Sequence, residues 1–281
     1  MIRSSFALPN HAGEVIHGDL RHRQDVRQAP VVVILHGFKG FKDWGFFPEI
    51  SLRLAESGYA TVCFNFSRNG IGTDPRKFTE MEKFAENTIS HELADASRVI
   101  EAIQSGEIGG KAVDPERIGL LGHSRGGGIA ILLAEKLADD IQCLVTWASV
   151  ASFFRFNDDH IRQWEERGYI EVENVRTGQM MRMNKTFWDD LQQHREEYDL
   201  LRAVSNVDAP SLFIHGNADT TIPHEESEKL YEACGAVSKR LEIIEGANHT
   251  FGIQHPMEQA SQHFEIVADL TENWLDSYLQ I

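Results

Sequence analysis

The sequence has few of the features that mark disulfide-rich, metal-binding or secreted proteins. It holds three cysteines, Cys63, Cys143 and Cys234, and no CxxC or Cys/His metal-binding spacing. We therefore expect buried free thiols rather than a disulfide framework or a metal site. The N-terminus lacks the apolar run of a signal peptide, and no segment is long enough to span a bilayer. Unless a leader has been removed, these absences favour a cytoplasmic enzyme.

Positive charge is also scarce. The chain has 27 basic and 43 acidic residues and a formal net charge of −16. This balance argues against nucleic acids and anionic membrane surfaces as partners. We interpret the acidity chiefly as a source of solubility, and secondarily as a field that disfavours strongly anionic substrates.

The length and the pattern of apolar residues predict one large α/β domain. With 281 residues, 42% of them hydrophobic, the chain can bury a substantial core. Short antiparallel strands are expected before Pro30, followed by buried strands at 31–37, 59–66, 118–122, 142–149, 209–216 and 239–246. Helical patterns lie between them at 47–57, about 84–105, 129–138, 224–234 and about 257–279. Alternating strands and helices predict a mostly parallel sheet flanked by helices on both faces.

The interval 152–206 interrupts this alternation. We expect a short helix from Asp158, its N-cap, to Gly168, then a β-hairpin formed by 169–175 and 179–184, then a helix over 186–194. The interval is interpreted as a cap, or lid, inserted into a core made of residues 1–151 and 207–281. The alternative is a surface excursion with no role in substrate binding.

A candidate nucleophile lies in the motif G-x-S-x-G, which spans residues 122–126 with Ser124 at its centre. A strand pattern precedes the motif and a helix pattern follows it, as expected for a sharp turn that exposes a serine hydroxyl. Glycine is required on both sides because a side chain there would collide with neighbouring backbone. The alternative, a glycine-rich phosphate-binding turn, lacks the P-loop lysine and the G-x-G-x-x-G spacing.

A serine nucleophile needs a base and a carboxylate that orients the base. His249 follows the strand pattern at 239–246 and is the candidate base; His224 and His255 are its rivals. Asp219 follows the strand pattern at 209–216 and is the candidate acid, in the chain order Ser, Asp, His. The alternative for Asp219 is a turn residue that caps the following helix.

Two backbone N–H groups are predicted to form an oxyanion hole. One belongs to Arg125, directly after the nucleophile, and the other to Phe38, in the loop that begins His36-Gly37. Gly37 would let the chain bend there; the alternative is an ordinary turn at the end of a strand.

The remaining candidate residues concern the substrate. We predict that Gly37, His123, Trp164, Met181 and Trp188 contact a small-molecule ester. An apolar or aromatic acyl group would suit the large side chains of the interval, although most of them are better explained as packing between cap and core. The large side chains of the interval 152–206 are Phe153, Phe154, Phe156, Trp164, Met180, Met181, Met183, Phe187 and Trp188. Exposed aromatic residues on the cap would also permit a homodimer.

Together the motifs HGF, GHSRGG, HGNADTTIP and GANHTF resemble those of the α/β-hydrolase superfamily. The HGF loop and an insertion with a hairpin are most similar to bacterial feruloyl and cinnamoyl esterases and their dienelactone-hydrolase-like relatives. The resemblance implies hydrolysis of carboxylic esters through an acyl-serine, with no metal or organic cofactor and a hydroxycinnamoyl ester as leading substrate. One departure is the loop Ser67–Gly72, where those esterases have N/R-G-H-G-x-S. Alternatives are a thioesterase, a small-peptide or aminoacyl hydrolase, a cofactor-free perhydrolase and a non-catalytic binding protein.

Overall fold

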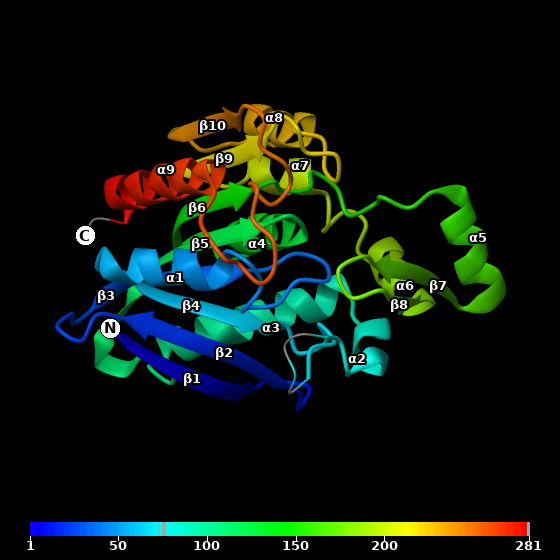
Figure 1. Cartoon of the computed structure of the whole chain (residues 1–281), viewed down its shortest axis with the longest axis horizontal. Coiled ribbons are helices and arrows are strands. Elements are labelled where there is room, and N and C mark those ends of the chain that lie inside the picture. Colours follow the sequence, from blue (N-terminus) through cyan, green and yellow to red (C-terminus); the bar gives the residue numbers. More distant parts are fainter. Residues whose placement is uncertain (73, 75–76, 280–281) are drawn as a thin grey trace.

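An eight-stranded sheet runs through the centre of the computed structural model, which describes residues 1–72, 74 and 77–279 (Figure 1). Across the sheet the strands follow the order β1-β2-β4-β3-β5-β6-β9-β10. Pairing is antiparallel for β1 with β2 and for β2 with β4, and parallel for the rest. The strands are β1 (Ile2–Pro9), β2 (Val15–His22), β3 (Ala29–Leu35), β4 (Ala60–Asn65), β5 (Val113–His123), β6 (Ile141–Trp147), β9 (Ser211–Gly216) and β10 (Lys239–Ile244).

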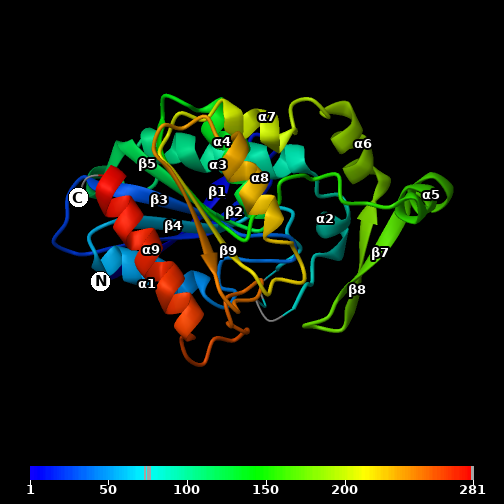
Figure 2. The same ribbon diagram turned by 90° about the horizontal axis from the view of Figure 1, so that it is seen from above.

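Helices cover both faces of this sheet (Figure 2). On one face lie α1 (Phe47–Glu56) and α9 (Gln262–Tyr278). On the other lie α3 (Ile89–Gln104), α4 (Arg125–Lys136), α7 (Leu200–Ser205) and α8 (Glu225–Ala233). Each face has its own apolar core, and every residue of β3 is buried, as expected for a strand covered on both sides. The predicted α/β fold is confirmed. No helix within the described residues has the length and apolar character needed to cross a membrane.

Some predicted boundaries were wrong. Instead of one long helix at 84–105 the chain forms α2 (Met81–Ala85) and α3, because the Thr88 side chain accepts the His91 N–H and starts a new helix. The N-cap of α5 (Asp158–Arg167) is Asn157 rather than Asp158, since the Asn157 side chain accepts the His160 N–H. Gly168 ends this helix in the left-handed conformation, as predicted.

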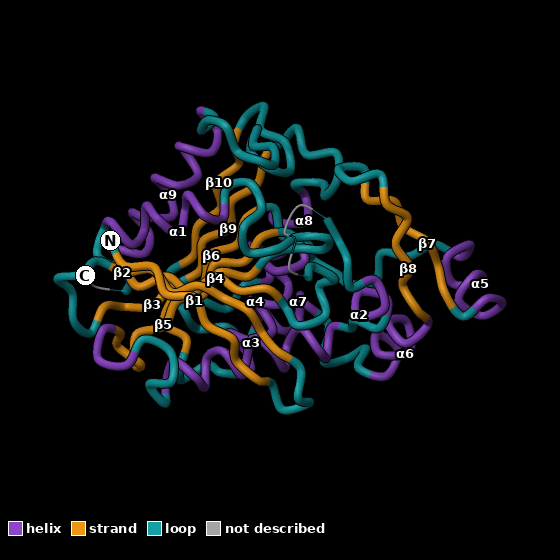
Figure 3. The backbone as a smooth tube through the Cα atoms, turned by 60° about the horizontal axis from the view of Figure 1, so that its bottom comes forward, coloured by secondary structure: helices purple, strands orange, loops and turns teal. Residues whose placement is uncertain are grey.

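Between β6 and β9 the chain forms α5, the hairpin β7 (Tyr169–Asn174) and β8 (Gln179–Asn184), and α6 (Lys185–Gln193). Figures 1 and 3 show this group standing beside the main sheet, with the two hairpin strands separate from the others. We call α5, the hairpin and α6 the cap. By contrast α7, also within 152–206, packs on α4 and α8 and so lies against the core.

Polar contacts attach the cap to the core at several points. Lys39 Nζ donates to the Glu173 carbonyl at 2.9 Å. The Gln179 side chain donates to the Phe78 carbonyl at 2.8 Å and accepts the Phe78 N–H at 3.2 Å. These bonds hold the hairpin near the carboxyl ends of the parallel strands, where ligands bind in open α/β sheets.

Candidate active site

Ser124 lies at the sharp turn between β5 and α4, with φ of 58° and ψ of −122°. A non-glycine residue seldom adopts this conformation, and the turn presents the serine at the carboxyl edge of the sheet. The flanking glycines are required by space: a Cβ on Gly122 would come 2.3 Å from the Gly126 carbonyl oxygen, and one on Gly126 would come 2.4 Å from that of Leu35. The local strain expected from the motif is therefore present.

The structure brings the three triad candidates together from the ends of β5, β9 and β10. His249 Nε2 lies 3.1 Å from Ser124 Oγ, and His249 Nδ1 lies 2.7 Å from Asp219 Oδ2. An ionised carboxylate only accepts hydrogen bonds, so Nδ1 carries the proton and Nε2 is left to accept the Ser124 hydroxyl. His224, one of the rival bases, lies instead at the start of α8.

Asp219 has more partners than the sequence suggested. Its Oδ1 accepts the N–H groups of Thr221 at 2.8 Å and Ile222 at 3.0 Å, so the turn role and the contact with His249 coexist. Its Oδ2 also accepts a hydrogen bond from the buried His215 Nε2 at 3.1 Å. Burial would raise the pKa of Asp219, but hydrogen bonds from His215, His249 and the Ile222 N–H outweigh it and hold the pKa well below its usual range. The carboxylate beside His249 is therefore ionised.

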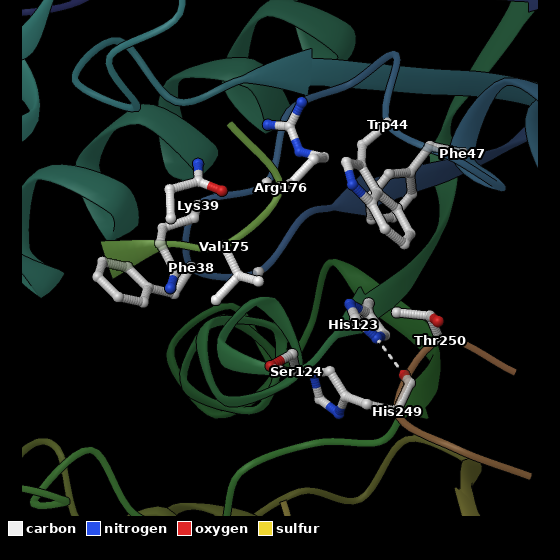
Figure 4. Close-up of a pocket in the computed structure, with 13 residues that line it drawn as sticks. Phe38, Lys39, Trp44, Phe47, His123, Ser124, Val175, Arg176, His249 and Thr250 are labelled. Carbon is white, nitrogen blue, oxygen red and sulfur yellow. Dashed lines mark hydrogen bonds between the residues drawn. The ribbon is translucent and has the colours of Figure 1, made fainter. Parts of the chain in front are cut away.

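Two buried histidines position the site. His123 Nε2 donates to the His249 carbonyl at 3.0 Å, the bond drawn in Figure 4. Burial, with a smaller contribution from His249, lowers the pKa of His123 to about 3. His36 Nδ1 donates to the Gly37 carbonyl at 2.9 Å, and burial lowers the pKa of His36 to about 4. Both rings are neutral, and each fixes a backbone segment next to Ser124.

The predicted oxyanion donors lie on two segments that meet at Ser124. A Cβ on Gly37 would come 2.8 Å from Ser124 Cβ, so the loop after β3 passes directly against the nucleophile. Within the described part of the chain, neither the Phe38 N–H nor the Arg125 N–H donates a hydrogen bond. The first N–H groups of a helix have no partner inside the helix, so Arg125 has a free donor at the start of α4.

The Arg125 side chain is nearly buried. It forms an ion pair with Glu92 of α3, whose side chain is 2% exposed. Its guanidinium lies 4.5 Å from the centre of the Phe38 ring and 5.8 Å from that of Phe187 in α6. Sequence reasoning missed this pair, which connects the nucleophile helix, the oxyanion loop and the cap.

A cavity of about 360 Å³ opens beside Ser124 (Figure 4). Of the predicted substrate contacts, Gly37 and His123 line it. Trp164, Met181 and Trp188 do not, which corrects that expectation. The other lining residues are Phe38, Lys39, Gly40, Trp44, Phe47, Asn174, Val175, Arg176, His249 and Thr250.

These three large side chains instead hold the cap together. Trp164 and Met181 are fully buried, and the Trp164 ring stacks on Trp188 with centroids 5.7 Å apart. Met181 faces the same side of the hairpin as Ile170, because residues two apart on a strand share a face. Nowhere in the described residues do three His, Cys, Asp or Glu side chains gather to hold a metal ion.

Comparison with known proteins identifies the family of this chain. The family model described as the prolyl oligopeptidase family matches residues 44–278. The chain belongs to the prolyl oligopeptidase family. Its structure has the α/β-hydrolase fold. Among curated proteins, isoprenylcysteine alpha-carbonyl methylesterase of Arabidopsis thaliana is 25% identical over 235 residues, which cover 79% of this chain and 50% of that protein. The chain thus spans half the length of this relative.

Solved structures agree on the fold. Est1E from Butyrivibrio proteoclasticus, with ferulic acid bound, has a TM-score of 0.76 at 19% identity, covering 98% of this chain and 100% of that one. Dienelactone hydrolase from Anabaena variabilis has a TM-score of 0.64 at 18% identity, covering 99% of each chain. These structures confirm the resemblance to the α/β-hydrolase superfamily that the motifs predicted. At 18% and 19% sequence identity the likeness concerns the fold.

Proposed function

We propose that the chain hydrolyses small carboxylic esters through an acyl intermediate on Ser124. The observation that carries the proposal is the hydrogen-bonded series from Ser124 through His249 to Asp219, which opens into the cavity. A carboxylate, an imidazole and a hydroxyl in this order are the groups that acyl transfer needs.

In the first half of the reaction, His249 Nε2 takes the hydroxyl proton as Ser124 Oγ attacks the ester carbonyl carbon. The carbonyl oxygen becomes negative and is stabilised by the N–H groups of Phe38 and Arg125. The imidazolium is stabilised by the Asp219 carboxylate. It then gives its proton to the alkoxide oxygen as the carbon–oxygen bond breaks, so the alcohol leaves and the acyl group stays on Ser124.

Water completes the cycle. His249 removes a proton from a water molecule, whose oxygen attacks the acyl carbon, and the same two N–H groups stabilise the second oxyanion. Collapse breaks the bond to Ser124 Oγ, which recovers its proton from His249, and the carboxylic acid is released. The ionised Asp219 favours this proton cycle because it stabilises the charged imidazole between the steps.

We propose that the acyl part of the ester is compact, and that a hydroxycinnamoyl group is the leading candidate. Aromatic side chains support it, since Phe38, Trp44 and Phe47 all line the cavity. The likeness in fold to a structure with ferulic acid bound is consistent with the same choice. We further propose that the cap acts as a lid, because residues 174–176 form part of the cavity wall.

Hydrolysis of small peptides or aminoacyl compounds is a second candidate function. The match to the prolyl oligopeptidase family favours it, and the same three side chains would perform it. The leaving group would then be an amine, protonated by His249 in place of an alcohol.

A substrate panel tests both candidates. Activated acetate, feruloyl, thioester and aminoacyl substrates are compared for the unmodified chain, Ser124→Ala and the control Ser152→Ala, which alters a serine outside the cavity. We expect ester hydrolysis with the unmodified chain and the control, and loss with Ser124→Ala. Full activity of Ser124→Ala on an activated ester would overturn the mechanism, and a preference for aminoacyl substrates would favour the second candidate.

A further inference from the structure

The charge of the cavity wall differs from that of the whole chain. Acidic residues outnumber basic ones by 43 to 27, yet none of the residues that line the cavity beside Ser124 is Asp or Glu. Two of the lining residues are cations, Lys39 from the loop after β3 and Arg176 from the hairpin turn. Because charges beyond about 8 Å are largely screened at physiological salt, a ligand in the cavity responds to the charges around it rather than to the net charge. Besides these two cations, the nearby charges are Glu173, which acts on Lys39, and the Asp219 carboxylate behind His249.

Arg176 is a cation with no counter-ion among the residues that the structure describes. Its guanidinium lies 5.0 Å from the centre of the Phe41 ring and 5.8 Å from that of Phe78, both of which are buried. Its Nη2 is buried and has no hydrogen-bond partner among the described residues, and no described carboxylate pairs with it. Burial also lowers the pKa of Arg176. Desolvating a guanidinium without an anion is unfavourable, so a bound anion would relieve the cost.

Lys39 helps to place Arg176 across the cavity from the nucleophile. Its Nζ donates to the Glu173 carbonyl at 2.9 Å, which joins the oxyanion loop to the hairpin. Gln179, on the other side of the turn, is bonded to the backbone of Phe78. The hairpin turn is thus held from both sides, and Figure 4 shows Arg176 on the side of the cavity opposite Ser124 and His249.

We propose that the cavity selects esters that carry a carboxylate, and that Arg176 binds this group while Ser124 attacks the ester. The proposal rests on the proposed function and deepens it. A single negative charge suits the site better than a phosphate dianion, because there is one unpaired guanidinium and the Lys39 ammonium already donates to a backbone carbonyl. The carboxylate is a binding group and takes no part in bond making or breaking.

The carboxylate could belong to the acyl part or to the alcohol part of the ester, and matched substrates distinguish them. On the acyl side, the 4-nitrophenyl monoester of adipic acid is compared with its neutral terminal amide. On the alcohol side, 3-acetoxybenzoate is compared with 3-acetoxybenzamide. In at least one pair we expect kcat/KM for the anion to exceed that for the neutral ester by about tenfold or more, chiefly through KM, as for a charge-assisted hydrogen bond.

Arg176→Met should remove this preference, so that kcat/KM for the anionic ester falls about tenfold or more relative to kcat/KM for its neutral partner. The matched control is Arg182→Met, in the same hairpin, because Arg182 is 59% exposed, lies over Tyr169 and does not line the cavity. Should Arg176→Met fail to fold, competition in the unmodified chain replaces it: adipate should inhibit hydrolysis of the neutral ester, and adipamide should not.

The outcomes distinguish failure of this inference from failure of the proposed function. If neutral esters are hydrolysed as fast as their anionic partners in both pairs, or if Arg182→Met abolishes a preference as fully as Arg176→Met, the carboxylate site is refuted and the ester hydrolase stands. If no ester of either charge is hydrolysed, or Ser124→Ala keeps its activity, the proposed function itself fails.

Discussion

The buried ion pair between Arg125 and Glu92 provides a demanding test of how the site is held in place. Both side chains are nearly inaccessible, 12% and 2% exposed, and each has a polar atom without a partner among the described residues, Arg125 Nε and Glu92 Oε2. Burial raises the pKa of Glu92 and lowers that of Arg125, so each charge depends on the other. Removing one partner would leave the other as an uncompensated buried charge.

From this geometry, Arg125→Met or Glu92→Gln should each destabilise the fold by about 3–5 kcal/mol, the usual result of breaking a buried pair. Arg125→Met also loses the contact with the Phe38 ring, worth about 0.5–2 kcal/mol. Because the oxyanion loop then lacks its support, we expect kcat on a neutral ester to fall about tenfold to a hundredfold. Urea denaturation and initial rates measure the two effects.

The double variant Arg125→Met/Glu92→Met decides whether the pair is the cause. It removes both charges, so its cost should be well below the sum of the single costs. The control is Arg202→Met in α7. It breaks an exposed ion pair with Glu135, which lies on α4 like Arg125, and should lower the free energy of unfolding by less than about 1 kcal/mol. Additive costs in the double variant would refute the reasoning.

Three further predictions concern the site itself. Gly37→Ala places a Cβ 2.8 Å from Ser124 Cβ, so the loop must shift; kcat should fall about a hundredfold with KM little changed, and an unaltered kcat would refute the close approach. Asp219→Asn keeps the acceptor for the turn but loses the negative charge; kcat should fall by about 10⁴, and a small effect would exclude Asp219 as the orienting acid. In the folded chain the pKa of His123 is lowered to about 3, whereas in the unfolded chain it is about 6.5. As the pH falls below about 6.5, this histidine binds a proton in the unfolded chain but not in the folded one, so the free energy of unfolding decreases. From pH 7 to pH 5 the free energy of unfolding, measured in urea, should fall by about 2 kcal/mol more in the unmodified chain than in His123→Gln. Equal decreases would contradict the neutral state of His123.

The fold and the meeting of the three triad candidates at one edge of the sheet were predictable because both follow from order along the chain. Runs of buried β-branched residues mark the parallel strands, and successive parallel strands end at one edge of the sheet. Ser124, Asp219 and His249 each follow a strand, so chain order alone brings them to that edge. The glycine spacing then identified the turn, since only glycine fits at Gly122 and Gly126.

The substrate side of the cavity was not predictable in the same way. Trp164, Met181 and Trp188 are large and apolar, but size does not reveal whether a side chain faces the substrate or the interior of the cap. The structure buries Trp164 and Met181 inside the cap, with the half-buried Trp188 of α6 packed against Trp164. The hairpin turn, with Val175 and Arg176, reaches the cavity instead, and a turn has no periodicity that marks it as a wall.

Buried polar partners were missed for a related reason. Glu92 is one of 43 acidic residues and lies in an amphipathic helix, and His215 is one of thirteen histidines, so neither stands out by composition. Only the packing of α3 beside α4 and the turn after β9 brings them to Arg125 and Asp219. The first pair depends on how two helices dock, and the second on how the turn after β9 folds back; local pattern determines neither.

The central claim is that Ser124 is the nucleophile, and covalent labelling tests it most directly. The unmodified chain and Ser124→Ala are treated with a fluorophosphonate, which reacts with an activated serine, and the digested peptides are analysed by mass spectrometry. We predict a single adduct on the peptide that contains Ser124, absent from Ser124→Ala and lost on unfolding. An adduct on another residue, or undiminished labelling of Ser124→Ala, would contradict the account.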